Sequence, residues 1–141
     1  MNAEGTTYGY ARVSTKDENL DRQIDALTAF GVKEKLIYRD KASGTDFDRP
    51  AFRRLIKKLR SRDVIVIKSI ERLGRNYSEI LDEWRSITKN RGAAIVVLDM
   101  PLLDTREVKD EITGKFLADL VLQLLSYVAQ VERENIKQRK V

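Results

Sequence analysis

The sequence contains neither cysteine nor histidine among its 141 residues. Without cysteine the chain cannot form disulfides, a thiol nucleophile or a cysteine-ligated zinc site. Without histidine it cannot build a Ser-His-Asp triad, and most transition-metal sites are excluded. Any chemistry must therefore be carried by hydroxyl, carboxylate, lysine or arginine side chains.

Other common signals are missing as well. No run of apolar residues approaches the length of a membrane span, and the first ten residues, MNAEGTTYGY, do not resemble a signal peptide. The phosphate-binding patterns G-x-x-x-x-G-K-[ST] and G-x-G-x-x-G are both absent, which argues against an NTPase and a simple dinucleotide fold. We expect a cytoplasmic protein that has no membrane partner and needs no cofactor.

Positive charge is in excess, with 27 Lys and Arg against 22 Asp and Glu, for a net charge of +5. This total suits a polyanionic partner, but it is also found in many proteins that have none. The distribution is more informative, because residues 49–62 hold seven basic side chains and no acid. Such a segment is typical of a surface that contacts a phosphate backbone, and Arg53, Lys57 and Lys58 are its candidate DNA contacts.

Strand and helix patterns alternate along residues 1–112. Strands are predicted at 6–13, 35–39, 63–68 and 93–98, and helices at 20–30, from Pro50 onward with Asp48 as a cap, and over about 77–87. Strands that alternate with helices indicate an α/β fold with a mostly parallel central sheet flanked by helices. We expect residues 1–112 to form one catalytic domain.

Residues 113–141 have a composition that suits one long helix. Its first half is apolar on nearly every side, and its second half is polar. A helix that is apolar all round must be buried all round, yet one small domain covers only one of its sides. We therefore expect a second copy of the chain to cover the other side, with Phe116, Leu120, Leu124 and Val128 at the dimer interface. The alternative is an internal core helix of a monomer.

Three groups of polar residues lie near the predicted ends of strands and helices. Tyr10, Arg12 and Ser14 alternate at the end of the first strand, so they share one face. Arg72 and Arg75 follow the third strand and could reach the same crevice, where open α/β sheets bind ligands. A third group could orient the first two: Gln23, Asp40, Arg49 and Glu71. A solvated strand end remains an alternative interpretation.

Five motifs resemble one known family along almost the whole chain. They are GYARVST at 9–15, NLDRQIDAL at 19–27, DKASGTDFDRPAF at 40–52, ERLGRN at 71–76 and SYVAQVERENI at 126–136. Together, and in this order, they resemble the catalytic domain of the serine site-specific recombinases, the resolvase and DNA invertase family. The resemblance implies double-stranded DNA as the substrate, a homodimer, and a homotetramer when two recombination sites are joined.

The resemblance also implies roles for single residues. Ser14 resembles the nucleophile that forms a 5′-phosphoserine link to DNA, and Arg12, Arg72 and Arg75 resemble the arginines that hold the scissile phosphate. The supporting active-site residues would be Tyr10, Gln23, Asp40, Arg49 and Glu71. On the last helix, Glu132 and Arg133 fall where subunits assemble, and Arg133, Lys137 and Arg139 are further candidate DNA contacts. The nature of the base that deprotonates Ser14 stays open among Glu71, Asp40, an acidified hydroxyl and a neutral arginine.

Serine attack on a phosphodiester conserves the energy of the broken bond, so neither ATP nor histidine is required. Three arginines would stabilise the negative charge that develops at phosphorus. The chain departs from the family pattern at Glu71, where Asp is usual, and at Ser69 and Ile70, so the orientation of Arg72 is in question. Relatives carry a DNA-binding region after the long helix, and we expect such a region to be absent from this chain. Two alternatives are a non-enzymatic basic α/β module that binds nucleic acid and a metal-dependent nuclease that uses Asp40 and Glu71.

Overall fold

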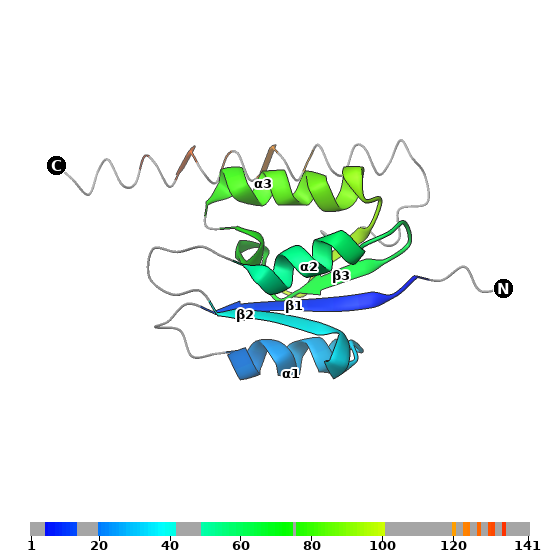
Figure 1. Cartoon of the computed structure of the whole chain (residues 1–141). Helices are drawn as coiled ribbons and strands as arrows, with labels where there is room; N and C mark the ends of the chain where they lie inside the picture. Colours follow the sequence, from blue (N-terminus) through cyan, green and yellow to red (C-terminus); the bar gives the residue numbers. More distant parts are fainter. Residues whose placement is uncertain are drawn as a thin grey trace.

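The chain was analysed as a computed structural model that describes residues 5–13, 20–41, 49–74 and 76–100. Seven further residues near the C-terminal end are also described: Leu120, Gln123, Leu124, Tyr127, Gln130, Val131 and Glu134. Within these ranges the chain alternates strands and helices, as the sequence predicts (Figure 1).

The centre of the fold is a four-stranded sheet with strand order β2-β1-β3-β4. Its strands are β1 (Thr7–Val13), β2 (Ile37–Lys41), β3 (Val64–Ile67) and β4 (Ala94–Val97), and every neighbouring pair is parallel. The second strand begins two residues later than predicted, because residues Glu34–Leu36 form a 3-10 turn, η1. The amide of Leu36 donates to the Lys33 carbonyl at 2.8 Å, which closes this turn before the strand begins.

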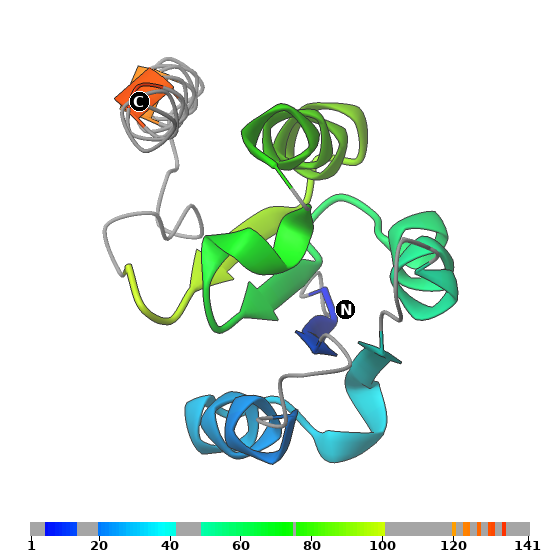
Figure 2. The same cartoon turned by 90° about the vertical axis from the view of Figure 1, so that its left-hand side faces the viewer.

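Helices cover both faces of the sheet (Figure 2). Helix α1 (Leu20–Phe30) lies on one face, and α2 (Pro50–Lys58) and α3 (Tyr77–Arg85) lie on the other. A π-helical turn, η3 (Ser86–Asn90), extends α3 toward Gly92, whose positive φ of 69° suits a residue without a Cβ. The mostly parallel α/β fold predicted from the sequence is confirmed.

The core is divided by the sheet into two clusters, as strand alternation requires. On the α2 and α3 side, Tyr10, Ile65 and Ile67 pack with Phe52 and Trp84. On the α1 side, the intervening strand residues pack with Leu27, Val32 and Ile37. Because every second residue of β1 faces α2 and α3, this strand directs Tyr10 and Arg12 toward the same layer.

The order of the strands determines where a ligand is expected. From β1 the chain moves to β2 at one edge and then crosses back over β1 to β3, so the direction of winding reverses between β1 and β3. Open α/β sheets bind ligands at the carboxyl ends of the two strands that flank such a reversal. In this chain those ends are Val13 and Ile67.

The last segment was predicted as a long dimerisation helix over 113–141. All seven of its described residues are helical and exposed. Leu120, Leu124, Tyr127 and Val131 are 43%, 47%, 67% and 37% exposed. The two other predicted interface residues, Phe116 and Val128, lie outside the described residues. Within the part of the chain that the structure describes, no helix is long and apolar enough to cross a membrane.

Candidate active site at the carboxyl ends of β1 and β3

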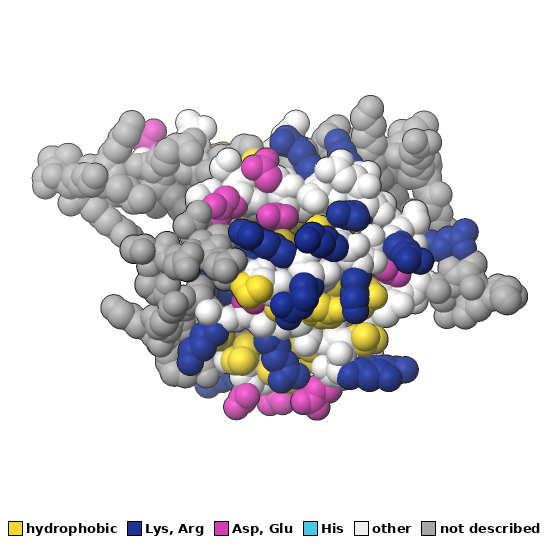
Figure 3. All heavy atoms as spheres, viewed as in Figure 1, with side chains coloured by type: hydrophobic (Ala, Val, Ile, Leu, Met, Phe, Trp, Pro, Cys, Tyr) yellow, Lys and Arg dark blue, Asp and Glu magenta, His cyan; other side chains and the backbone are white. Residues whose placement is uncertain are grey.

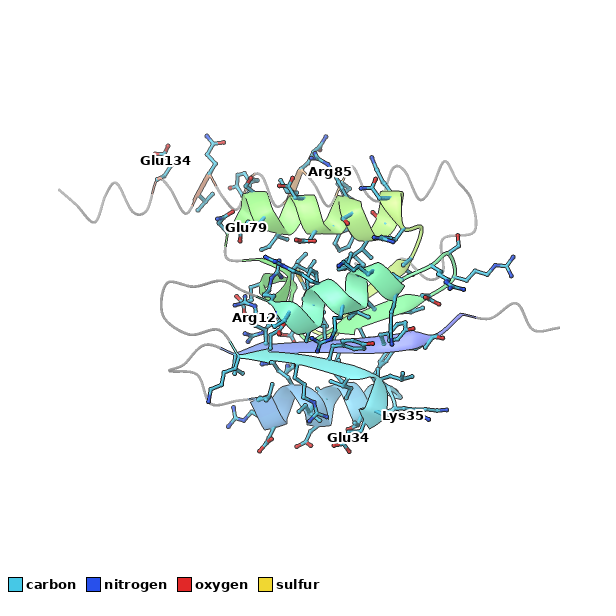
Figure 4. The ribbon with its side chains drawn as sticks, viewed as in Figure 1. Arg12, Glu34, Lys35, Glu79, Arg85 and Glu134 are labelled. Carbon is cyan, nitrogen blue, oxygen red and sulfur yellow. The ribbon has the colours of Figure 1, made fainter. Side chains whose placement is uncertain are left out.

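Arg12 extends from the end of β1 to the turn that follows β3. This turn contains the 3-10 helix η2 (Ile70–Leu73) and continues to Gly74. Nη2 of Arg12 donates to the carbonyl oxygens of Glu71 at 2.7 Å and Gly74 at 3.5 Å, and its Nε donates to that of Arg72 at 3.4 Å. Figure 4 shows Arg12 at the same end of the molecule as Glu79 and far from Lys35.

The backbone of Arg12 is held from two other directions. Gln23 of α1 accepts a hydrogen bond from the Arg12 amide at 3.1 Å and donates to the Arg12 carbonyl at 2.9 Å. Nη1 of Arg72 donates to the same carbonyl at 2.9 Å. The last paired residues of β1 and β3 are Tyr10 and Ile67. Beyond that pair, the side chains of Gln23 and Arg72 supply the hydrogen bonds of the Arg12 backbone that β3 does not.

Arg49 precedes α2 and holds the same turn from the other side. Its side chain is buried, and the guanidinium carbon lies 4.2 Å from the centroid of the Phe52 ring. Nη1 donates to the Leu73 carbonyl at 2.6 Å, and Nη2 forms an ion pair with Glu83 of α3 at 3.1 Å. Four consecutive carbonyl oxygens, from Glu71 to Gly74, are therefore held by Arg12 and Arg49 together.

Asp40, at the end of β2, caps helix α2. Its Oδ1 accepts from the amide of Ala51 and its Oδ2 from the amide of Phe52, both at 2.9 Å. The Tyr10 hydroxyl donates to Oδ2 at 2.8 Å. Burial, reinforced by the charge of Asp40, raises the pKa of Tyr10, so its hydroxyl remains protonated and a donor. Asp48 was predicted to cap this helix, and it lies outside the described residues.

The site brings together one buried arginine, Arg49, and two partly buried ones, Arg12 and Arg72. Burial lowers the pKa of Arg12, and the neighbouring charges of Arg49 and Arg72 lower it further. The Nε atom of Arg72 is buried and has no hydrogen-bond partner among the residues that the structure describes. Arginines that repel one another and retain an unused buried donor would be stabilised by an anion, and a phosphate oxygen accepts such donors well.

The family profile described as "Resolvase, N terminal domain" matches residues 7–141. The chain belongs to the resolvase family. The resemblance inferred from its five motifs is thereby confirmed.

Individual relatives agree with this assignment. The chain is 38% identical over 132 residues to the Transposon Tn3 resolvase of Escherichia coli, covering 94% of this chain and 66% of that protein. It is 33% identical over 132 residues to the serine recombinase gin of Escherichia phage Mu, covering 93% of this chain and 62% of that protein. The resolvase-family chain thus spans slightly less than two thirds of the length of these curated relatives.

A solved structure shows the same fold. The crystal structure of the N-terminal catalytic domain of TP901-1 integrase superposes on this chain with a TM-score of 0.61 at 26% sequence identity. The match covers 92% of this chain and 97% of that domain. The resolvase-family fold therefore includes the sheet and the helices that position the arginines.

The structure brings together most of the predicted supporting residues of this resolvase-family site. Arg12, Gln23 and Arg72 meet at the end of β1, Arg49 reaches the same turn, and Tyr10 and Asp40 form a hydrogen-bonded pair beside α2. The predicted nucleophile Ser14 and the third arginine, Arg75, lie outside the described residues. Because Ser14 directly follows Val13 in the chain, it is the first residue after β1.

Glu71 takes part through its backbone. Its carbonyl accepts from Arg12, while its carboxylate accepts a hydrogen bond from the Ser69 hydroxyl at 3.3 Å. Within the described part of the chain no hydrogen bond or ion pair joins the Glu71 carboxylate to Arg72. Among the described residues, Arg72 is oriented by its hydrogen bond to the carbonyl oxygen of Arg12.

The predicted DNA contacts on α2 point in two directions. Arg53 and Lys57 line an open groove of about 520 Å³ between α2 and α3, whereas Lys58 lies 5.8 Å from the centroid of the Tyr38 ring. Figure 3 shows that this face of the molecule is rich in lysine and arginine, with acidic side chains above it on α3 and below it. The other three predicted contacts, Arg133, Lys137 and Arg139, lie outside the described residues.

Sequence reasoning missed Glu83, which pairs with Arg49, and Phe52, which packs against the same guanidinium. Glu83 is one of three acidic residues in helix α3, and the pattern of α3 alone does not single it out. It also missed that backbone carbonyls of residues 71–74 are the acceptors for Arg12 and Arg49. The close approach of this turn to α3 is also visible only in the structure, where a Cβ at Gly74 would lie 2.7 Å from the Cβ of Glu79.

Proposed function

We propose that the chain is the catalytic domain of a serine site-specific recombinase, with Ser14 as its nucleophile. The observation that carries this proposal is the convergence of Arg12 and Arg72 at the carboxyl ends of β1 and β3, where Arg12 lies two residues before Ser14 in the chain. Arg49 adds a third guanidinium to the same turn. The family to which the chain belongs, and the relatives named as resolvases and a serine recombinase, support the same reaction.

In the proposed reaction the Ser14 hydroxyl oxygen attacks a DNA phosphorus atom. A new bond forms between the serine oxygen and phosphorus, the bond from phosphorus to the 3′ oxygen breaks, and the 3′ hydroxyl leaves with a proton. The resulting 5′-phosphoserine retains the energy of the phosphodiester, so a 3′ hydroxyl from the exchanged strand can attack it without ATP. Arg12, Arg72 and Arg75 stabilise the charge that develops on the phosphoryl oxygens in both steps.

The contacts of Asp40 favour this reaction over metal-dependent cleavage. Both carboxylate oxygens already accept hydrogen bonds from α2 amides, and Oδ2 also accepts from Tyr10. The carboxylate of Asp40 is thus already hydrogen-bonded to the start of α2 and to Tyr10. The buried guanidinium of Arg49 lies over Phe52 at the start of the same helix, which opposes binding of a divalent cation nearby. These contacts favour a supporting role for Asp40 over metal ligation.

A homodimer and a synaptic homotetramer are part of the proposal. Leu120, Leu124, Tyr127 and Val131 recur at intervals of four, three and four residues, so they form one stripe on a helix. Their exposure in the single chain favours cover by a second copy over an internal core helix. We assign residues 1–112 to catalysis and 113–141 to dimerisation, with Phe116 and Val128 in the same interface.

The proposed substrate is double-stranded DNA carrying a recombination site, and a cytoplasmic location is part of the proposal. Arg53, Lys57 and Lys58 on α2, with Arg133, Lys137 and Arg139 on the last segment, would contact the phosphate backbone. Such contacts supply affinity and position, whereas recognition of a sequence requires contacts to bases. Recognition of the site would therefore require a separate DNA-binding region, which the resemblance to the family implies would be joined after the long helix.

The test is a search for covalent protein on DNA. The chain is joined after Val141 to a DNA-binding domain of known site, and supercoiled DNA carries two such sites around a randomised central segment. After quenching with denaturant, the proposal predicts protein attached to 5′ ends, free 3′ hydroxyls, and no effect of EDTA. Cleavage that EDTA abolishes would support the nuclease, and DNA binding without cleavage would support a non-enzymatic module.

A further inference from the structure

The buried guanidinium of Arg49 connects three separate elements of the fold. It lies at the start of α2, donates to the Leu73 carbonyl in η2 at 2.6 Å, and pairs with Glu83 of α3 at 3.1 Å. The Arg49 side chain is 7% exposed, so its charge is largely shielded from water. A buried cation is stable only when other hydrogen bonds replace those it made with water, and the carboxylate of Glu83 accepts one of them.

The turn held by Arg49 also carries Arg72. The carbonyl of Leu73, which accepts from Arg49, belongs to the residue directly after Arg72. On the other side of the turn, Arg72 donates through Nη1 to the Arg12 carbonyl at 2.9 Å, and within the described part of the chain its buried Nε has no hydrogen-bond partner. Any displacement of the Leu73 carbonyl would therefore move the backbone that sets the position of the Arg72 guanidinium.

Glu83 itself is held at a defined depth. Its side chain is 28% exposed and lies in the wall of the groove between α2 and α3, which also contains Arg53 and Lys57. Burial raises the pKa of Glu83, and the charge of Arg49 opposes that rise. Because the groove is open, a different side chain at this position can be accommodated without filling the core.

We propose that Glu83 is a positioning residue for the active-site arginines. It fixes the guanidinium of Arg49, which fixes the carbonyl of Leu73 and thereby the turn that presents Arg72. Glu83 acts through Arg49 and does not contact the reacting phosphate. This inference rests on the proposed recombinase function, because it assigns to Glu83 a part in the same site.

The experiment compares four variants of the recombinase fused to its DNA-binding domain. Glu83→Leu removes the oxygen that accepts the hydrogen bond from Arg49. Glu83→Asp shortens the side chain by one methylene, so its carboxylate lies farther from Arg49. Glu83→Gln keeps an acceptor oxygen at the end of a side chain of the same length. Asp82→Leu is the matched control, since Asp82 lines the same groove on the same helix and makes no hydrogen bond to Arg49. Cleavage rates at saturating DNA, DNA dissociation constants and the NMR signals of the arginine Nε–H groups are measured for each.

We expect Glu83→Leu and Glu83→Asp to slow cleavage about tenfold or more at saturating DNA, as loss of a charged hydrogen bond would. Their DNA dissociation constants should change by less than about twofold, since Glu83 does not contact DNA. The Nε–H signals of Arg49 and Arg72 should shift or broaden in both. Glu83→Gln and Asp82→Leu should cleave within about threefold of the parent and keep these signals, because both retain an acceptor for Arg49.

The inference and the proposed function fail in different ways. If the parent forms no covalent complex with DNA, the recombinase assignment is wrong, while the arginine signals still report whether Glu83 sets the position of Arg72. If the parent cleaves and Glu83→Asp matches it in rate and in the Arg72 signal, the positioning role is wrong. Glu83→Asp and Glu83→Gln decide the question even if Glu83→Leu does not fold.

Discussion

Arg12 and Arg72 hold each other through their backbones. Arg72 donates from Nη1 to the carbonyl oxygen of Arg12 at 2.9 Å, and Arg12 donates from Nε to the carbonyl oxygen of Arg72 at 3.4 Å. Like charges are thus brought together at the ends of two strands, and the charge of Arg72 contributes to the lowered pKa of Arg12. Like charges that repel one another at close range are typical of a functional site, and here the two positive charges suit a phosphate ligand.

Removing either arginine should slow the chemical step. We expect Arg12→Ala and Arg72→Ala each to lower the rate of covalent-complex formation by a factor of about 100 or more, because each removes a preorganised donor. The measurement is single-turnover cleavage at saturating DNA.

Lysines on α2 provide the contrast. Lys57→Ala and Lys58→Ala should leave cleavage at saturating DNA nearly unchanged. They should weaken binding, and the salt slope of log K should fall by about 0.9 for each DNA phosphate that the variant no longer neutralises. Equal rate losses from the lysine and arginine variants would mean that the arginines act as ordinary backbone contacts.

Asp40 should be important for stability as well as for the site. Asp40→Ala leaves the Ala51 and Phe52 amides and the Tyr10 hydroxyl without their acceptor, so we expect the free energy of unfolding to fall by about 2 kcal/mol or more. Urea denaturation of the chain measures this change. Tyr10→Phe, which removes only the donor, should cost less than Asp40→Ala, and the reverse order would contradict the assigned capping role.

The turn at Gly74 lies so close to α3 that there is no room for a Cβ at this position. An added Cβ would lie 2.7 Å from the Cβ of Glu79 and 2.9 Å from the amide nitrogen of Ile80, so Gly74→Ala must displace one of them. We expect a loss of about 1–3 kcal/mol in stability, with slower cleavage because Arg12 bonds the Gly74 carbonyl. Ser69→Ala at the half-buried start of the turn is the control. A stable, fully active Gly74→Ala would show that the turn does not need this approach.

Much of the fold could be predicted because hydrophobic patterns in this chain are strong. The apolar runs that became β3 and β4 and the spacing of Leu20, Ile24 and Leu27 fixed both the element types and their order. The start of β2 was wrong by two residues, because a hydrogen bond from Leu36 back to Lys33 forms η1 first. Such a local turn leaves no mark on the pattern of hydrophobic residues.

The site could be predicted in part. Alternation along β1 placed Tyr10 and Arg12 on one face, and the ends of parallel strands implied that Arg72 would meet them. Glu83 could not be predicted, because its role depends on which face of α3 packs against Arg49, a tertiary relationship. The acceptors of Arg12 are backbone carbonyls, and these have no signature in the side chains of the sequence.

The exposed stripe on the last helix should be a dimer interface. A charge at Leu124 would be buried against the second copy, so Leu124→Glu should shift the chain toward monomer in sedimentation equilibrium. Gln130→Glu is the control, because it adds the same charge to the same helix at an exposed polar residue outside the apolar stripe. It should weaken association less. A chain that stays monomeric at hundreds of micromolar before any substitution would contradict the interface.

The identity of the DNA-linked residue tests the central claim most directly. Covalent complexes are trapped, digested with nuclease and protease, and the phosphorylated peptide is sequenced by mass spectrometry, with Ser14→Ala and Thr15→Ala as matched hydroxyl deletions. The account predicts phosphate on Ser14, no covalent complex with Ser14→Ala despite unchanged folding and DNA affinity, and retained cleavage with Thr15→Ala. Phosphate on any other residue, or cleavage by Ser14→Ala, would contradict it.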